Sequence, residues 1–254
     1  DEMIDYTPIS IYDDVELNYT SEACHTLLIA PSGAGKTMLL VFILSMTIKR
    51  GHLPYVVDCK NTSFGAISKG IGLPTVTNPN EIIEMLADLV EQMEQTYQTY
   101  FSSDSVSLDS NFKDFGLPAH VLIFDEVLAG LESGNKKDKV EIERLLKQLA
   151  LKGRMAGFIV ILTSQKLLST DLSLAINSQC QTRILMGANV SDELFHTALG
   201  GYKKDVGTMY KGGVGKGYAV TPRTGLTYFE APYMDFSKIN FKELLGKLVH
   251  KNNV

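Results

Sequence analysis

The chain has 254 residues, of which 44% are hydrophobic, and carries a formal net charge of −5 at pH 7. This length fits one large domain or a domain with a small appendage, and the apolar content argues against a disordered chain. A negative total charge gives no general attraction to nucleic acid, so any contact with DNA has to come from local basic loops.

Cysteines and hydrophobic runs set further limits. Cys24, Cys59 and Cys180 lie far apart without C-x-x-C spacing, which indicates reduced thiols in a core and no structural metal. The longest apolar run, Met38 to Ile48, is too short to cross a bilayer and is explained by a buried helix. No signal peptide opens the chain. A start at Asp1 is compatible with an excised domain, which leaves a membrane anchor elsewhere in a parent protein open.

Residues 1–22 are polar with scattered apolar positions, and we expect a lead-in segment with one edge strand. A short apolar run, 26–29, then precedes a loop of small residues and a helical run from Met38 to Lys49. This order of strand, loop and helix is the context of a phosphate-binding loop, in which backbone N–H groups and a helix N-terminus surround a polyphosphate. The residues expected to bind the nucleotide here are Pro31, Ser32, Gly33, Ala34, Gly35, Lys36 and Thr37.

Within this loop, Lys36 is expected to reach the terminal phosphates, and the Thr37 hydroxyl is expected to ligate Mg²⁺. Ala30 stands where the motif usually has its first glycine. An alanine is tolerated there unless the backbone is left-handed, so we interpret it as harmless variation. The alternative is a chance loop rich in small residues, which the flanking strand and helix disfavour.

A second strand is expected at 53–58, a long helix from Asn78 onward, and a surface loop at 102–113. The buried run 121–124 then ends in Asp125 and Glu126. Such a strand end can supply the other half of a hydrolysis site, with Asp125 holding Mg²⁺ and Glu126 accepting the proton of the attacking water. Acidic strand ends are common, but the phosphate-binding loop makes coincidence much less attractive.

The stretch 134–139 is predicted to be a basic, flexible turn before a helix that ends near Gly153. A fourth buried strand, 158–162, is closed by a segment ending at Gln165, which could contact the γ-phosphate or the lytic water. A simple capped strand end is the alternative for Gln165. A fifth strand at 182–186 completes a strand and helix alternation, which predicts an α/β fold with a parallel, doubly wound sheet.

Beyond Gly200 the composition shifts to lysine, tyrosine and glycine. The pair Gly215-Lys216 is rejected as a second phosphate loop, because Gly217 replaces the hydroxyl residue that Mg²⁺ needs. A loop that contacts nucleic acid and a plain hairpin turn remain open for this segment. A closing β-hairpin around 222–225 and a last helix from Phe241 to Lys251 follow. We therefore divide the chain into residues 1–22, a motor domain at 23–235 and a C-terminal amphipathic helix within 236–254.

Several of these segments together resemble the motor domain of FtsK/SpoIIIE DNA translocases in the HerA superfamily. The resemblance covers roughly Leu27 to Phe229 and rests on the segments 124–126, 134–140, 152–158, 163–165 and 182–184. Asp58-Cys59-Lys60 resembles the family's Asp-Pro-Lys, and 207–210 looks like the segment before a second DNA-facing loop. Gln165-Lys166-Leu167 departs from the usual Gln-Arg-Pro. Among relatives, the chain looks most like the coupling ATPases of conjugative elements (TcpA-like).

The resemblance implies a RecA-like P-loop ATPase that uses ATP and Mg²⁺, acts as a hexameric ring and moves DNA through its pore. It also implies a trans arginine, for which Arg154 and Arg183 are candidates. The loops at 134–139 and 203–216 would then line the pore. The candidate DNA contacts are Lys136, Lys137, Lys203, Lys204, Lys211 and Lys216.

Three functions remain open at this point. The first is an ATPase that translocates DNA or couples it to a transfer channel, with a membrane channel or relaxase complex as a further partner. The second is an FtsK-like motor that moves protein in type VII-like secretion, and the third is a nucleotide-binding scaffold without turnover. The expected location is the cytoplasm, or the inner face of the cell membrane if a region absent from this chain tethers it.

Overall fold

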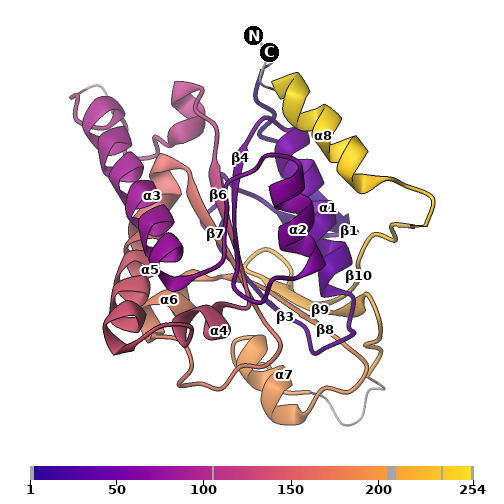
Figure 1. Cartoon of the computed structure of the whole chain (residues 1–254). Coiled ribbons are helices and arrows are strands. Elements are labelled where there is room, and N and C mark those ends of the chain that lie inside the picture. Colours follow the sequence, from indigo (N-terminus) through magenta and orange to yellow (C-terminus); the bar gives the residue numbers. More distant parts are fainter. Residues whose placement is uncertain (1–2, 105, 205–209, 236, 253–254) are drawn as a thin grey trace.

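The computed structural model describes residues 3–104, 106–204, 210–235 and 237–252. Within them lie one eight-stranded sheet, a separate two-stranded sheet and helices on both faces of the large sheet (Figure 1). The strands are β1 (Ile9–Tyr12), β2 (Val15–Leu17), β3 (Thr26–Ile29), β4 (Leu53–Asp58), β5 (Thr75–Val76), β6 (His120–Asp125), β7 (Phe158–Ser164), β8 (Thr182–Met186), β9 (Lys216–Thr221) and β10 (Gly225–Glu230). The helices are α1 (Lys36–Lys49), α2 (Ser63–Gly70), α3 (Pro79–Tyr100), α4 (Val127–Leu131), α5 (Lys136–Ala156), α6 (Leu174–Gln179), α7 (Asp192–Ala198) and α8 (Phe241–Asn252), with a 3₁₀ turn η1 (Phe112–Phe115).

The large sheet has the strand order β10-β9-β8-β3-β7-β6-β4-β5. Its six strands from β8 to β5 run parallel, and the hairpin of β9 and β10 adds two antiparallel strands at one edge. The carboxyl ends of β3, β6 and β7 therefore meet at one edge of the sheet, with β7 between the other two. This confirms the predicted α/β class with a mostly parallel sheet and a C-terminal hairpin, and this edge is where ligands bind in open α/β sheets.

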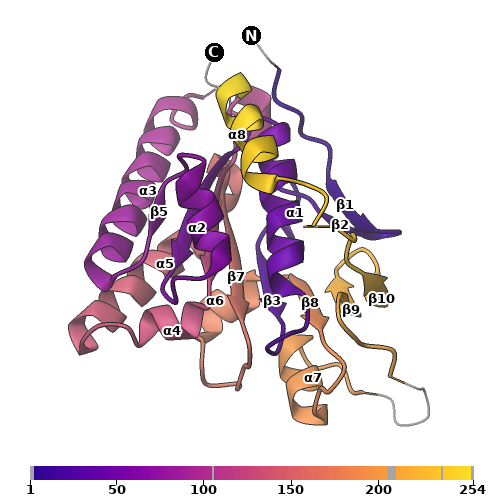
Figure 2. The ribbon, with the colours of Figure 1, turned by 45° about the vertical axis from the view of Figure 1, so that its right-hand side comes forward.

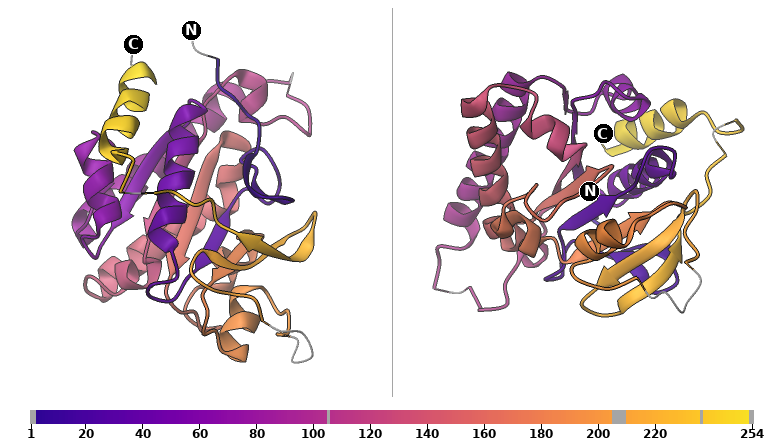
Figure 3. Two further views of the ribbon diagram at one scale, coloured as in Figure 1. Left: turned by 90° about the vertical axis from the view of Figure 1, so that its right-hand side faces the viewer. Right: turned by 90° about the horizontal axis from the view of Figure 1, so that it is seen from below.

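Two hydrophobic clusters cover the two faces of the sheet. One contains side chains of α1, α2, α8 and the two-stranded sheet, and the other contains side chains of α3, α5, α6 and α7. Figure 2 shows α3 and α5 on one side and α1 and α8 on the other. Strands β3, β7 and β8 are buried along their whole length, as expected for parallel strands covered on both faces. Figure 3 shows α8 and the first described residues at the end of the molecule away from α7.

The lead-in segment differs from the expectation of one edge strand. It forms β1 and β2, which pair with each other rather than with the large sheet. Ile9, Val15 and Leu17 are buried and join the cluster over α1. The apolar residues scattered through this segment therefore serve to pack the hairpin on the core. The division of the chain at residues 22 and 235 stays a prediction.

Both predicted boundaries of helix α5 were wrong. Lys136 already lies in the helix, because Asn135 accepts the Asp138 N–H and Asp138 accepts the Asn135 N–H, which together form a capping box. The helix also continues through Gly153 and ends at Gly157, whose φ of 83° is left-handed. A Cβ at Gly153 would lie 2.1 Å from the Phe158 carbonyl oxygen, so this glycine permits close packing and does not end the helix.

The other predicted elements are confirmed, namely the strands at 26–29, 53–58, 121–124, 158–162 and 182–186, the long helix after Asn78, the hairpin and the last helix. Short elements escaped prediction: α2, α4, α6, α7 and β5. Each has eight residues or fewer, which leaves little room for a periodic pattern.

Candidate active site

The loop after β3 has the backbone of an anion cradle. Gly33 and Gly35 have left-handed φ values of 78° and 94°, which L side chains rarely adopt, and Gly35 caps the 14-residue helix α1. No acidic residue lies in the first turn of α1, so its positive end is not neutralised there. Ala30 is not among the described non-glycine residues with positive φ, and its N–H donates to the Ser164 oxygen at 2.9 Å. The alanine is thus unstrained, as the sequence suggested.

Lys36, the first residue of α1, reaches across to the end of β6. Its Nζ lies 3.0 Å from Asp125 Oδ1 and also pairs with Glu126 Oε1. The side chains of Asp125 and Glu126 are only 3% and 6% exposed, and that of Lys36 is 14% exposed. The two motifs recognised separately in the sequence therefore meet in one buried cluster, which sits beside the anion cradle.

Glu126 lies in an unusual backbone conformation. Its φ of 57° and ψ of 60° place it in the left-handed region at the start of α4. This conformation costs a non-glycine residue about 1–2 kcal/mol. Its N–H donates to Thr163 Oγ1 at 3.0 Å, and that hydroxyl in turn donates to Asp125 Oδ1 at 2.7 Å. A fully buried threonine of β7 thus holds both acidic residues, and the sequence gave no sign of it.

The end of β4 adds three side chains to the same edge. Asp58 lies beside Asp125 in the register of β4 and β6, and burial, with Asp125 nearby, raises its pKa above the ordinary value. Cys59 donates its thiol to the Glu126 carbonyl oxygen at 3.4 Å, and burial raises its pKa to about 11, which keeps the thiol protonated. Lys60 Nζ lies 3.8 Å from Glu126 Oε2, so a second cation faces this carboxylate.

A turn from the distant segment before β9 packs on the phosphate-binding loop. The Gly215 N–H donates to the Ala34 oxygen at 2.8 Å, and a Cβ at Gly35 would lie 3.0 Å from the Gly215 nitrogen. Gly187, at the end of β8, faces Ala34 from another side. The sequence analysis rejected Gly215 as part of a second phosphate loop, and the structure instead places it against the first.

Two other predicted site residues lie near this edge. Thr37 follows Lys36 in the first turn of α1, and Gln165 follows β7 and is exposed. No hydrogen bond from either side chain is described, so their roles as Mg²⁺ ligand and phosphate sensor stay predictions.

The two candidate arginines differ sharply. Arg183 is 9% exposed, and its guanidinium donates to Asn177 O at 2.8 Å and Ala198 O at 3.3 Å. In this position it cannot reach a neighbouring molecule. Arg154 lies in the last turn of α5, at the amino end of β7, with a half-exposed side chain that makes one loose ion pair of 3.7 Å with Glu22.

The candidate DNA-contacting lysines also fall into two groups. Lys204 is engaged within the molecule, because its Nζ donates to Val190 O at 2.9 Å and lies 4.8 Å from the centre of the Tyr210 ring. Lys216 lies 4.0 Å from Glu230 and is otherwise exposed. The remaining four are exposed and have no ion pair among the described residues: Lys136, Lys137, Lys203 and Lys211. The predicted segment 207–209 and Asp205 lie outside the described residues.

The chemistry of the site suits magnesium bound together with a nucleotide. Mg²⁺ prefers oxygen ligands and is usually held by one or two protein groups plus substrate phosphates and waters. Asp125 supplies a buried carboxylate, and Thr37 supplies a hydroxyl on the adjacent helix turn. Within the described residues, no group of three His, Cys, Asp or Glu side chains could hold a metal alone. The residues present therefore fit an ion that arrives with phosphate ligands.

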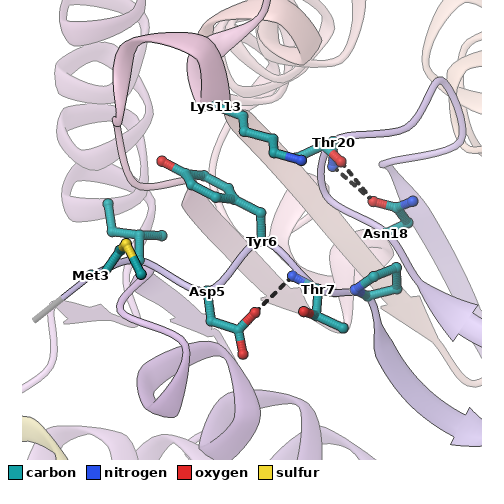
Figure 4. Close-up of a pocket in the computed structure, with 9 residues that line it drawn as sticks. Met3, Asp5, Tyr6, Thr7, Asn18, Thr20 and Lys113 are labelled. Carbon is teal, nitrogen blue, oxygen red and sulfur yellow. Dashed lines mark hydrogen bonds between the residues drawn. The ribbon is translucent and has the colours of Figure 1, made fainter.

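A separate hollow of about 550 Å³ lies beside the N-terminal segment and shares no residue with this site (Figure 4). Its polar groups already bond to one another: Asp5 accepts the Thr7 N–H, and Asn18 accepts both the N–H and the hydroxyl of Thr20. Lys113 lies 5.9 Å from the centre of the Tyr6 ring.

Fold and site together define a RecA-like P-loop ATPase architecture. No family model matches the chain. The FtsK domain-containing protein YdcQ of Bacillus subtilis (strain 168) is 24% identical over 208 residues, which are 82% of this chain and 43% of that protein. The DNA translocase FtsK of Streptococcus pneumoniae is 25% identical over 164 residues, which are 58% of this chain and 21% of that protein. The chain thus spans less than half the length of these relatives, and the predicted resemblance to FtsK-type motor domains is confirmed.

Solved structures show the same fold. The pCW3 conjugation coupling protein TcpA, in its monomer form with ATPγS, superposes with a TM-score of 0.79 at 18% identity, covering 96% of this chain and 71% of that one. The cytoplasmic domain of the Thermomonospora curvata type VII secretion ATPase EccC gives a TM-score of 0.70 at 19% identity, covering 96% and 30%. Among the described residues, no helix is both long and apolar enough to cross a bilayer.

Proposed function

We propose that this chain hydrolyses ATP with Mg²⁺ and uses the energy to translocate DNA, or to couple DNA to a transfer channel, as a ring of identical subunits. The observation that carries the ATPase part is the meeting of Lys36, Asp125 and Glu126 beside the anion cradle. In the proposed mechanism, the glycine loop and Lys36 bind the phosphates, and Asp125 and Thr37 hold Mg²⁺, which neutralises the phosphate charge. Glu126 then orients the attacking water and takes its proton.

Lys36 has two sets of partners in this mechanism. In the structure it neutralises the two carboxylates, whereas phosphate binding calls for the same ammonium group. Lys60 lies close enough to keep one cation next to Glu126 when Lys36 turns to the phosphates. The trans arginine is assigned to Arg154 rather than Arg183, because only Arg154 has an exposed side chain free to reach a neighbouring subunit. The hexameric state comes from the family resemblance.

Steady-state phosphate release with and without Mg²⁺ tests the ATPase part. The wild-type chain should release phosphate only with Mg²⁺. Glu126→Gln should abolish release while still binding ATP, because the amide keeps the shape of the side chain but cannot take a proton. Turnover by Glu126→Gln at the wild-type rate would contradict the assignment, and a wild-type chain that binds nucleotide without turnover would support the scaffold alternative.

DNA is the favoured substrate because the curated relatives named above include DNA translocases and because the exposed lysines lie on the segments that flank the site. The similarity to a type VII secretion ATPase favours protein as a second candidate. Replacing four exposed lysines by glutamine separates the two. The variant with changes at Lys136, Lys137, Lys203 and Lys211 should lose DNA binding if DNA is the substrate and keep its activity if polypeptide is.

The control carries four other exposed lysines changed to glutamine, on segments that precede the strands or at the end of α2. These are Lys69, Lys113, Lys152 and Lys242. Because the net charge changes equally, a loss of DNA binding in both variants would indicate a general charge effect instead of a surface for DNA. We place the protein in the cytoplasm or at the inner face of the membrane, with a channel or relaxase complex as a further partner.

A further inference from the structure

The hydroxyl of Thr163 is the feature of this site that neither sequence motif contains. It is fully buried on β7, the strand that lies between the phosphate-loop strand and the acidic strand. It accepts the Glu126 N–H at 3.0 Å and donates its own proton to Asp125 Oδ1 at 2.7 Å. One side chain therefore contacts the proposed metal ligand and the backbone of the proposed base.

We propose that Thr163 is a positioning residue that orients the Mg²⁺ ligand and the general base together; this rests on the function proposed above. A carboxylate that accepts a fixed hydrogen bond on one oxygen cannot turn freely about its terminal bond. Asp125 Oδ2 is thereby directed away from Thr163 and remains available to the metal or its waters. Such outer partners of metal ligands typically contribute 10- to 100-fold to metal affinity or activity.

The second contact acts on Glu126. Its left-handed backbone persists only if the surroundings impose it, and the hydrogen bond from its N–H is one such constraint. Cys59 holds the other side of the same residue, since its protonated thiol donates to the Glu126 carbonyl oxygen. Loss of the Thr163 hydroxyl would release the N–H and leave a buried donor without an acceptor. The carboxylate at the end of this turn would then lose its fixed direction.

The two contacts predict separable effects in Thr163→Val, which keeps the shape of the side chain but cannot form either hydrogen bond. Through Asp125, the affinity for the divalent ion should fall about 10- to 100-fold. Through Glu126, turnover at saturating Mg²⁺ should also fall. Thr163→Ser, which keeps the hydroxyl and loses only a methyl group, should restore both. Binding of the ATP analogue AMP-PNP without metal should not change, because the phosphate-binding loop is intact.

The experiment measures Mn²⁺ binding in the presence of AMP-PNP from the free-ion signal in electron paramagnetic resonance, alongside phosphate release at increasing Mg²⁺. Thr47→Val is the matched control: Thr47 is also fully buried, but it lies in the last part of α1, where its hydroxyl bonds Ile43 O and Tyr19. It should lose a comparable amount of stability and keep wild-type metal affinity.

Wild-type Mn²⁺ affinity and turnover in Thr163→Val would overturn the proposal. So would a Thr163→Ser variant with weakened metal binding, a comparison that remains decisive if the valine variant does not fold. The proposed function fails in a different way. If the wild-type chain binds Mn²⁺ and AMP-PNP but never releases phosphate, the ATPase is refuted, whereas the metal-binding comparison still decides the role of Thr163.

Discussion

Lys36→Ala should destabilise the folded chain as well as remove a phosphate contact. The substitution leaves Asp125 and Glu126 as two adjacent buried carboxylates without their main cation. Breaking a buried ion pair on one side typically costs about 3–5 kcal/mol. Lys60 remains 3.8 Å from Glu126 and offsets part of this loss, so we expect about 3 kcal/mol in the free energy of unfolding at pH 7.

Urea unfolding followed by circular dichroism measures this loss. For a slope of about 3 kcal/mol per molar urea, the midpoint should fall by about 1 M. In a Glu126→Gln background the same change should cost clearly less, because only one buried carboxylate then loses its partner. Lys60→Ala, at a 45% exposed side chain, is the control and should cost less than about 1 kcal/mol. An unchanged midpoint in Lys36→Ala would refute the reasoning.

Three further predictions concern other buried groups. Because burial lowers the pKa of three histidines to about 4, stability should be full above pH 6.5 and fall toward pH 4 by up to about 1.4 kcal/mol per pH unit for each one, measurable by thermal melting at stepped pH; these are His25, His52 and His120. A flat profile over this range would contradict their buried, neutral state. Burial raises the pKa of Cys59 from 9.0 to about 11, so iodoacetamide should label this thiol about 100-fold more slowly at pH 8 than in the denatured chain, and equal rates would count against it. Arg183→Ala should cost about 2 kcal/mol or more in urea unfolding by leaving buried carbonyls unpaired, whereas Arg154→Ala should cost under about 1 kcal/mol and lower ATP turnover; the reverse pattern would exchange their assignments.

The elements predicted best from sequence are those whose burial is written in the residues themselves. The strands at 26–29, 158–162 and 182–186 are continuous apolar runs because both faces of the sheet are covered. Lys36, Asp125 and Glu126 could be singled out because short motifs preserve their spacing from a strand end. Their meeting in space followed from the shared edge of a parallel sheet.

The start of α5 was missed although the sequence contained the signal. Asn135 and Asp138 stand three residues apart just before a helical pattern, which is the spacing of a capping box. The lysines between and after them were instead interpreted as a flexible basic turn. Local composition was given more weight than capping chemistry in that prediction.

Thr163 and Gly215 could not have been found this way. The contact of Thr163 with Asp125 depends on which strands are neighbours and on their register, and a threonine in an apolar run looks like any other buried residue. Gly215 lies 180 positions after Gly35 in the sequence, and only the folded chain brings the two together. The conformation of Glu126 is equally invisible, since no local glycine or asparagine marks its positive φ.

The central claim is tested most directly by ATP hydrolysis measured with and without double- and single-stranded DNA at two salt concentrations. The account predicts that DNA stimulates phosphate release by the wild-type chain and that the stimulation weakens steeply at the higher salt, because binding through phosphate contacts releases counterions. It also predicts no release by Glu126→Gln under any of these conditions. Hydrolysis that neither form of DNA changes at either salt concentration would contradict the proposal of a DNA motor.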